Sequence, residues 1–322
     1  MTKTTPAAGV SDSDRFVEIV EAGMRDGLQI EAKLLTTEQK LELINDVIES
    51  GIRHLEVTAF VSPRAVPQMA DAEALLAGIH RRPNTNLMAL IPNLRAAARA
   101  ATTGLTGGVL MSSASNTHNS KNLNRTIDET ISGFPAIADV LRDAGIEVLG
   151  GIATAFGCPF EGEVSHEAIL KIVRGLMDVG VRQLTLGDTT GMATPMNIRS
   201  LVRRLRKEFP DLGITLHLHN TRGIGLANVL VGLEEGVRRY DATTGGLGGC
   251  PFAPGATGNI CTEDLVYLLQ EAGYETGVDL NRSIAVARKM EGFLDKPLVG
   301  QVMKAGPRLR QYDPSSARVA VG

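Results

Sequence analysis

The sequence predicts an α/β protein, a (β/α)8 TIM barrel followed by a small C-terminal appendage. From Phe16 onward, eight short apolar or β-branched runs alternate with longer segments of helical period, the pattern of repeated βα units around a parallel sheet. Unusual polar residues recur at the carboxyl ends of these runs, where barrels place their sites. No G-x-G-x-x-G motif follows the first run, so the pattern favours a barrel over a doubly wound sheet.

Composition bounds the class of protein. The 322 residues are 43% hydrophobic and 21% charged, which suffices for a large core and is unlike a disordered chain. A formal net charge of -3 gives no reason to expect nucleic acid or an anionic membrane as a partner. No apolar run approaches the roughly 20 residues that span a bilayer. The N-terminus shows no signal or transit pattern, and three cysteines imply no disulfide framework, so we expect a cytoplasmic protein.

The eight expected strands follow one another from residue 17 to residue 247. They read VEIVEAG (17–23), HLEVTAF (54–60), NLMALI (86–91), GGVLMSSA (107–114), EVLGGIATAF (147–156), QLTLGD (183–188), TLHLHN (215–220) and YDATTGGL (240–247). Between them lie amphipathic segments such as TEQKLELINDVIESG (37–51), in which Leu41, Ile44 and Val47 recur at helical spacing.

Several of these helical segments end in a glycine just before the next strand, which suits a left-handed C-cap. These glycines are Gly51, Gly104, Gly145 and Gly180. We expect three parts in the chain: a disordered N-terminal extension over residues 1–15, a barrel domain over 16–280, and a C-terminal helical appendage and tail over 281–322.

The HLHN segment contains two histidines that could bind a metal ion. Side chains alternate faces along a strand, so Thr215, His217 and His219 share one face, which points inward in a barrel. The two histidines are either a metal-ligand pair or core side chains that hydrogen-bond to the backbone. The same alternation puts Glu56 and Thr58 inside the barrel, where an unpaired charge on Glu56 would be costly.

Other polar groups are expected at the same mouth of the barrel. Arg25, Asp26 and Gln29 follow the first strand, Ser115 follows the fourth, and Asp188 ends the sixth. Two imidazoles with oxygen ligands and no thiolate pair favour an octahedral ion, Mg²⁺ or Mn²⁺, over zinc. An open position on such an ion would serve substrate oxygens as a Lewis acid.

The eighth strand runs into GGLGGCPFAPGATGN, a glycine-rich segment around Cys250. Its backbone freedom suits a mobile lid that closes over a ligand. Cys250 is either a buried spectator or an acid, base or nucleophile beside the mouth. For Cys158, in FGCPFEG, we favour a structural role.

Taken together, these motifs resemble the 3-hydroxy-3-methylglutaryl-CoA lyases, metal-dependent carbon–carbon lyases built on a TIM barrel. The resemblance covers residues 16–280 and runs through VEIVEAGMRDGLQIE, LEVTAFVSPRAVPQMAD, SKNLN, GCPFEG, LGDTTGMATP, HLHNTRGIGLAN and GGLGGCPFAPGATGNICTEDLVYLL. The last motif, with its cysteine, is highly specific.

The resemblance implies a reaction and the residues that carry it out. It implies a divalent cation, Mg²⁺ or Mn²⁺, held by Asp26, His217, His219 and Asn259. It also implies that Arg25 steadies the enolate oxygen of the thioester, that Cys250 takes part in proton transfer, and that Asp188 and Glu56 organise the site and assist proton movement. The reaction would be retro-Claisen cleavage of 3-hydroxy-3-methylglutaryl-CoA to acetyl-CoA and acetoacetate, as in leucine degradation. The implied partner is the acyl-CoA substrate, and the implied assembly is a homodimer.

Some residues depart from the family's pattern and bear on the substrate. Met24 stands where proline is common, Asn116 and His118 where an acid and an aromatic residue are common, and NTRG where DTYG is common, so Asn220 and Arg222 are unusual. The substrate-binding residues that we expect at the mouth are Arg25, Gln29, Ser115, His118 and Arg222. The departures leave open another tertiary 3-hydroxyacyl-CoA as substrate, an acetyl-CoA-dependent Claisen synthase, or a silent barrel that binds a CoA ester.

Overall fold

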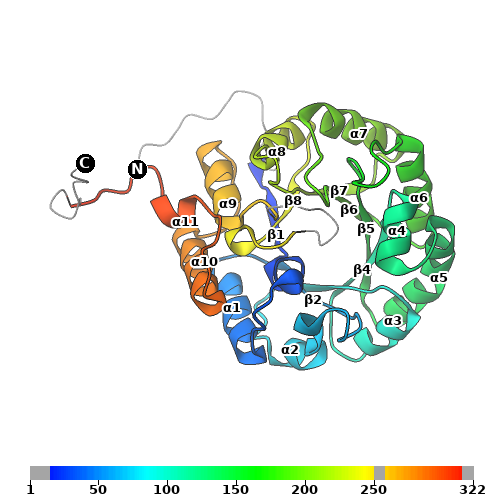
Figure 1. Ribbon diagram of the computed structural model, residues 1–322, viewed down its shortest axis with the longest axis horizontal. Helices are drawn as coiled ribbons and strands as arrows, with labels where there is room; N and C mark the ends of the chain where they lie inside the picture. The colour runs from blue at the N-terminus through cyan, green and yellow to red at the C-terminus, as the bar shows by residue number, and fades with distance from the viewer. Residues whose placement is uncertain (1–14, 250–257, 314–322) are drawn as a thin grey trace.

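The structure, a computed structural model, describes residues 15–249 and 258–313. Within these ranges eight parallel strands pair in sequence order and close into a barrel surrounded by helices (Figure 1). The predicted TIM barrel is therefore confirmed. Its strands are β1 (Glu18–Glu21), β2 (His54–Ala59), β3 (Asn86–Leu90), β4 (Gly107–Ser113), β5 (Glu147–Ala153), β6 (Gln183–Gly187), β7 (Gly213–His217) and β8 (Arg239–Ala242).

The helices cover the outer face of the barrel because each buries one apolar stripe against it. In α1, Leu43, Ile44 and Val47 are buried, whereas the opposite side of the helix is polar. The α-helices are α1 (Thr37–Glu49), α2 (Ala72–Gly78), α3 (Leu94–Ala100), α4 (Asn116–Leu123), α5 (Ile127–Asp143), α6 (His166–Asp178), α7 (Pro195–Glu208), α8 (Gly225–Glu234), α9 (Thr262–Glu271), α10 (Leu280–Leu294) and α11 (Val302–Ala305). Short turns of other helical types are η2 (Gly23–Gly27), η3 (Leu28–Ile30), η4 (Pro67–Met69) and η5 (Thr244–Gly246).

Local signals in the sequence set where these helices begin and end. Thr36 and Gln39 form a capping box at the start of α1, and Thr126 and Glu129 form another at the start of α5. The four glycines expected to end helices all have positive φ, as predicted: Gly51, Gly104, Gly145 and Gly180. At these positions the chain reverses toward the next strand without the steric cost that a side chain would bring.

Two strands differ from simple alternation. β7 ends at His217, and His219 lies beyond it, in an isolated antiparallel bridge with Asn259. In β2 the register shifts between Glu56 and Thr58. Thr58 therefore pairs with Ala89, which packs in the outer core, and the Thr58 hydroxyl contacts the sulfur of Met69. The prediction that Thr58 faces the barrel interior is wrong, because a bulge resets the alternation after Glu56.

The interior of the barrel has a polar and an apolar half. Side chains of β7 and β8, such as His217 and Asp241, line one side of the interior. A separate cluster inside the barrel joins Val20, Met88, Val109 and Leu149, away from the outer core. The cluster lies mostly on β3, β4 and β5, so strands of one sheet supply chemically different walls.

The C-terminal segment continues the helical layer. α10 lies against α1, α9 and η5 (Figure 1), and Lys289 of α10 forms an ion pair with Glu42 of α1 at 2.6 Å. Most of the proposed N-terminal extension and the end of the tail, residues 1–14 and 314–322, lie outside the described residues. No helix within residues 15–249 and 258–313 is both long enough and apolar enough to cross a membrane.

Two glycine substitutions should have opposite effects on stability. At Gly51, with φ +109, an added Cβ would run into the carbonyl oxygen of Gly277, so Gly51→Ala should lower the free energy of unfolding by about 1–3 kcal/mol. Gly292 lies within α10 and an added Cβ there meets nothing within 4 Å, so Gly292→Ala should raise it by about 0.5–1 kcal/mol. Urea unfolding followed by circular dichroism measures both. Equal effects from the two substitutions would contradict this account.

Candidate metal centre and active site

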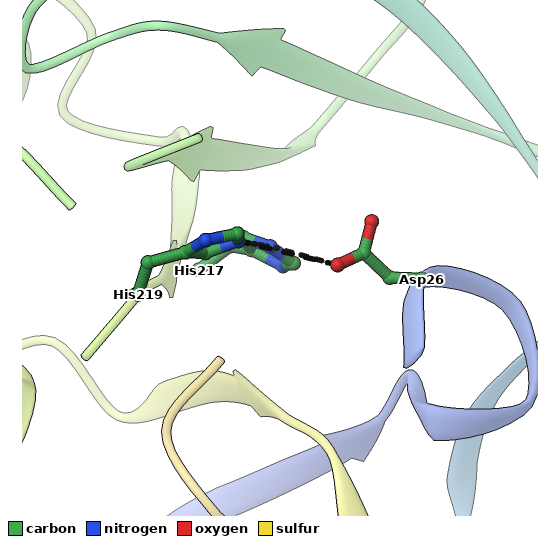
Figure 2. A group of neighbouring side chains, drawn as sticks. All are labelled: Asp26, His217 and His219. Atoms are coloured by element: carbon green, nitrogen blue, oxygen red, sulfur yellow. Dashed lines mark hydrogen bonds and ion pairs between the residues drawn. The ribbon is translucent and has the colours of Figure 1, made fainter. Parts of the chain in front are cut away.

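Three side chains converge at the mouth of the barrel (Figure 2). His217 Nε2 lies 3.7 Å from Asp26 Oδ2, and His219 Nε2 lies 4.0 Å from the same oxygen. The two Nε2 atoms are 3.2 Å apart. One ligand atom from each of the three residues lies within 4.8 Å of the others, and all three residues are buried. The geometry is that of a cluster able to hold one cation.

Different elements bring these three side chains together. His217 ends β7, and the bridge to Asn259 holds His219 two residues farther on, so both rings stay on the same side. Asp26 lies in η2, a π-helical turn directly after β1, in which all five residues are buried. Such turns are rare and occur often at functional sites.

Asn259 completes the cluster. Its Nδ2 donates to Asp26 Oδ2 at 2.7 Å and to the carbonyl of Leu247 at 3.0 Å. Its Oδ1 is buried and has no hydrogen-bond partner among the described residues. A buried amide oxygen without a partner is costly, and amide oxygens are good ligands for hard divalent cations. Asn259 thus fits a ligand role, as the sequence led us to expect.

The protonation states of the cluster suit a cation. Burial would raise the pKa of Asp26, but the charge of Arg25 and the two histidines outweigh it and lower that pKa to about 2. Burial and the neighbouring His217 lower the pKa of His219 to about 4. At neutral pH the cluster therefore offers a carboxylate and at least one neutral imidazole, the forms that bind metal ions.

Asp241 supports the cluster from behind, and the sequence analysis missed it. Its Oδ2 lies 3.1 Å from His217 Nδ1, so the ring presents Nε2 to the site. Burial would lower the pKa of His217, but the hydrogen bond to Asp241 and the charge of Asp26 raise it. The signal was present in YDATTGGL, because alternation places Asp241 inward when Tyr240 packs outward.

Arg25 and Glu56 form a second charged unit beside the cluster. Arg25 contacts Glu56 Oε1 through Nε at 3.0 Å and Asp26 Oδ1 through an amino nitrogen at 2.6 Å. Gln29 donates to the same Asp26 oxygen at 2.9 Å. Burial raises the pKa of Glu56, although Arg25 opposes the shift. The buried charge on Glu56 is thus paired, and the structure brings Arg25, Glu56 and Gln29 together as expected.

Asp188 lies behind the histidines rather than on the cavity wall. Its Oδ1 accepts hydrogen bonds from the backbone of Met192 at 2.6 Å and of Ala193 at 2.9 Å. Its backbone N–H donates to the carbonyl of His217. Burial raises the pKa of Asp188 to about 7. These contacts tie the loop after β6 to the ligand strand.

Of the other expected mouth residues that the structure describes, His118 lines the cavity, whereas Ser115 and Arg222 hold the surrounding loops. His118 lines the cavity and its Nδ1 lies 2.7 Å from Ser113 Oγ. Ser115 is buried, caps α4 through the backbone of His118, and contacts Cys158 Sγ at 3.0 Å. The guanidinium of Arg222 donates to the carbonyls of the loop after β6, one of them at 2.6 Å. Cys250 lies outside the described residues.

A cavity of about 640 Å³ opens over the cluster. Its lining includes Arg25, Asp26, Glu56 and both histidines, and also Lys121 and Asn122 of α4, to which the sequence analysis gave no role beyond their motif SKNLN. Cavities of this size hold small-molecule ligands. The arrangement can place a substrate's oxygen atoms at a cation and a developing negative charge beside a guanidinium.

A family model described as HMGL-like matches residues 16–290 of the chain. Cytoplasmic 3-hydroxy-3-methylglutaryl-CoA lyase of Rattus norvegicus is 39% identical over 276 residues, which are 86% of this chain and 80% of that protein. (R)-citramalyl-CoA lyase of Chloroflexus aurantiacus is 40% identical, over 90% of this chain and 95% of that protein.

A solved structure is also similar to this chain over most of its length. An HMG-CoA lyase from Acinetobacter baumannii, in complex with coenzyme A and 3-methylmalate, has a TM-score of 0.89 and 41% identity, and the match covers 93% of this chain and 98% of that one.

Removing one imidazole should weaken cation binding strongly. In His217→Ala the cluster loses a ligand, so affinity for Mn²⁺ should fall by at least about 100-fold. Isothermal titration calorimetry of the metal-free protein measures the change. His80→Ala, which removes an exposed histidine, is the matched control and should bind as the unaltered protein does. Unchanged Mn²⁺ affinity in His217→Ala would rule out this site.

Asp241→Asn tests the support of His217. The substitution keeps the shape but removes the charge behind the ring, so Mn²⁺ affinity should fall about 10–100-fold. The pKa of His217 in the metal-free protein should also fall, which NMR titration of the ring protons measures. Asp211→Asn, at an exposed position, is the control. A His217 pKa that does not move would show that Asp241 has only a packing role.

Proposed function

The chain belongs to the HMGL-like family of carbon–carbon lyases, and we propose that it cleaves 3-hydroxy-3-methylglutaryl-CoA to acetyl-CoA and acetoacetate with a bound Mg²⁺ or Mn²⁺. The observation that carries the proposal is the cluster of Asp26, His217 and His219 beside the Arg25–Glu56 pair in one cavity. The relatives that share this chemistry by name match more than four-fifths of the chain.

Asp26, His217, His219 and Asn259 are the residues that would hold the cation. The unpartnered Oδ1 of Asn259 and the deprotonated carboxylate of Asp26 support this assignment. A bound divalent cation makes a coordinated hydroxyl group more acidic and fixes its orientation.

The bond changes define what the chain must do. The substrate's 3-hydroxyl loses its proton, the C2–C3 bond breaks, and C3 becomes the carbonyl carbon of acetoacetate. The electron pair of the broken bond passes to C2 and the thioester as an enolate, which takes a proton at C2 and becomes acetyl-CoA. The protein must therefore accept one proton, stabilise one oxyanion and return one proton.

Arg25 and Glu56 are placed for two of these tasks. The guanidinium of Arg25 is held rigidly between Glu56 and Asp26, so it can meet the enolate oxygen with little reorganisation. Because burial raises the pKa of Glu56, its carboxylate is a stronger base than an exposed one. We assign proton acceptance to Glu56, and the positioning of the ligand strand to Asp188.

Cys250 has the remaining task in this proposal. We propose that its thiol protonates the enolate at C2, on the strength of its place in the glycine-rich segment after β8. Gly249, the described residue that precedes Cys250 in the sequence, lines the cavity.

A second substrate has an observation in its favour. (R)-citramalyl-CoA lyase is as similar to this chain as the 3-hydroxy-3-methylglutaryl-CoA lyases are. Citramalyl-CoA is also a tertiary 3-hydroxyacyl-CoA, with its carboxylate one carbon closer to C3, so the same bond changes apply to it. A direct comparison of kcat/KM for the two thioesters decides between them.

The assembly and the compartment stay predictions. We expect a homodimer, as the resemblance implied, and a cytoplasmic protein, as the cysteine content suggested. Relatives include cytoplasmic and mitochondrial forms. Light scattering of the purified protein measures the oligomeric state.

The metal-loaded protein should release acetyl-CoA from 3-hydroxy-3-methylglutaryl-CoA. Chelation with EDTA should lower kcat by at least about 100-fold, and added Mg²⁺ or Mn²⁺ should restore it. A coupled assay of acetyl-CoA release measures both. No release from either thioester by the metal-loaded protein would contradict the proposed reaction, and turnover that survives chelation would contradict the metal requirement.

A further inference from the structure

The cavity has an apolar wall opposite the metal cluster. We call it the inner wall and define it by Met88 and Leu90 of β3, Val109 and Met111 of β4, and Leu149 of β5. In the closed strand order, β3 lies four strands from β7, β4 lies four strands from β8, and β5 lies four strands from β1. The strands that carry the inner wall therefore lie across the barrel axis from β7, which ends at His217, from β8, which contains Asp241, and from β1 (Figure 1).

The inner wall carries no charged side chain. The charged residues that line the same cavity all belong to other segments and are Arg25, Asp26, Glu56, Lys121, Arg239 and Asp241. Arg239 reaches the wall at Met88, with Nη2 3.9 Å from its sulfur, and pairs with Glu18 at 3.3 Å. Against the other four side chains of the inner wall, a carboxylate would lose its hydration without gaining a partner, whereas an alkyl group would gain from burial. The inner wall is thus matched to an apolar part of a ligand.

The inner wall also has room to adjust. Barrel interiors are ordinarily filled by layers of bulky side chains, but Gly107 and Gly151 occupy inward positions of β4 and β5 here. The end of the Met111 side chain takes the place next to Gly151, because an added Cβ there would lie 2.7 Å from Met111 Cε and 2.9 Å from its sulfur. A methionine side chain changes conformation easily, so this space can be given up to a ligand.

We propose that the inner wall receives an apolar substituent on C3 of the acyl-CoA substrate, and that the protein prefers substrates whose substituent is larger than methyl. This inference rests on the proposed lyase function. With the C3 hydroxyl held at the metal cluster, the inner wall lies across the axis from C3. The substrate class is then 3-hydroxy-3-alkyl acyl-CoA thioesters, and the carbonyl product is the corresponding longer ketone.

A series of three thioesters tests the preference. They are 3-hydroxyglutaryl-CoA derivatives with methyl, n-propyl or n-pentyl on C3, which share one carboxylate and one thioester. Each buried methylene is worth about fourfold and n-propyl has two more than methyl, so kcat/KM for the propyl compound should exceed that for the methyl compound about 15-fold. Equal or higher kcat/KM for the methyl compound would overturn the preference and leave the lyase function intact. Release of acetyl-CoA from none of the three, nor from citramalyl-CoA, would refute the lyase function itself.

Two variants of the inner wall test its location. Val109→Phe fills the space in front of β4 and should bring the propyl-to-methyl ratio of kcat/KM down to about one or less. Met111→Ala enlarges the space and should raise the pentyl-to-methyl ratio several-fold. Leu230→Phe, an exposed position on α8, is the control and should leave both ratios unchanged. Circular dichroism confirms folding of each variant, and Met111→Ala still decides the matter where Val109→Phe does not fold. Ratios that no folded wall variant moves would overturn the location.

Discussion

The carboxylate of Asp26 is the charge around which the mouth of the barrel is arranged. It is buried, so it must be matched, and Arg25, Gln29, both histidines and Asn259 approach it from three parts of the chain. Two of these partners are themselves held by another carboxylate: Glu56 holds Arg25, and Asp241 holds His217. Buried polar networks are favourable only when their members are satisfied, and the unpartnered Asn259 oxygen is where a cation would complete this one.

A second buried carboxylate keeps the parts of the site in register. Glu21, the last residue of β1, accepts hydrogen bonds from the backbone of Gly23 and Thr244 and from the hydroxyl of Thr262. These contacts join the π-helical turn that carries Asp26 to the segment after β8 that leads to Asn259. The two ligands are far apart in sequence, and Glu21 fixes the spacing between the elements that present them. Burial raises the pKa of Glu21, while its hydrogen bonds oppose the shift. Within the described part of the chain, these hydrogen bonds maintain the local geometry.

Period and strand parity were enough to predict the barrel, the inward histidines and Glu56, because these follow from local pattern alone. The prediction for Thr58 was wrong because a bulge depends on how β2 pairs with β3, which the pattern of one strand does not contain. His219 was placed on the correct side by the same alternation, but the structure achieves this with a bridge to Asn259 beyond the strand end. The contacts of Arg222 and Ser115 with backbone and with Cys158 depend on loop conformation, and only the structure provides that.

The division of the barrel interior separates reaction from substrate choice. The groups that would bind the cation and move protons come from β1, β2, β7, β8 and the turns after them, whereas the inner wall comes from β3, β4 and β5. Because the barrel is closed, each set is held by its own neighbouring strands and meets the other only across the cavity. A change of volume in the inner wall can alter which acyl group fits without moving a ligand of the metal cluster. The reacting oxygen of the substrate stays fixed at one wall, and the other wall determines which size of apolar C3 substituent fits.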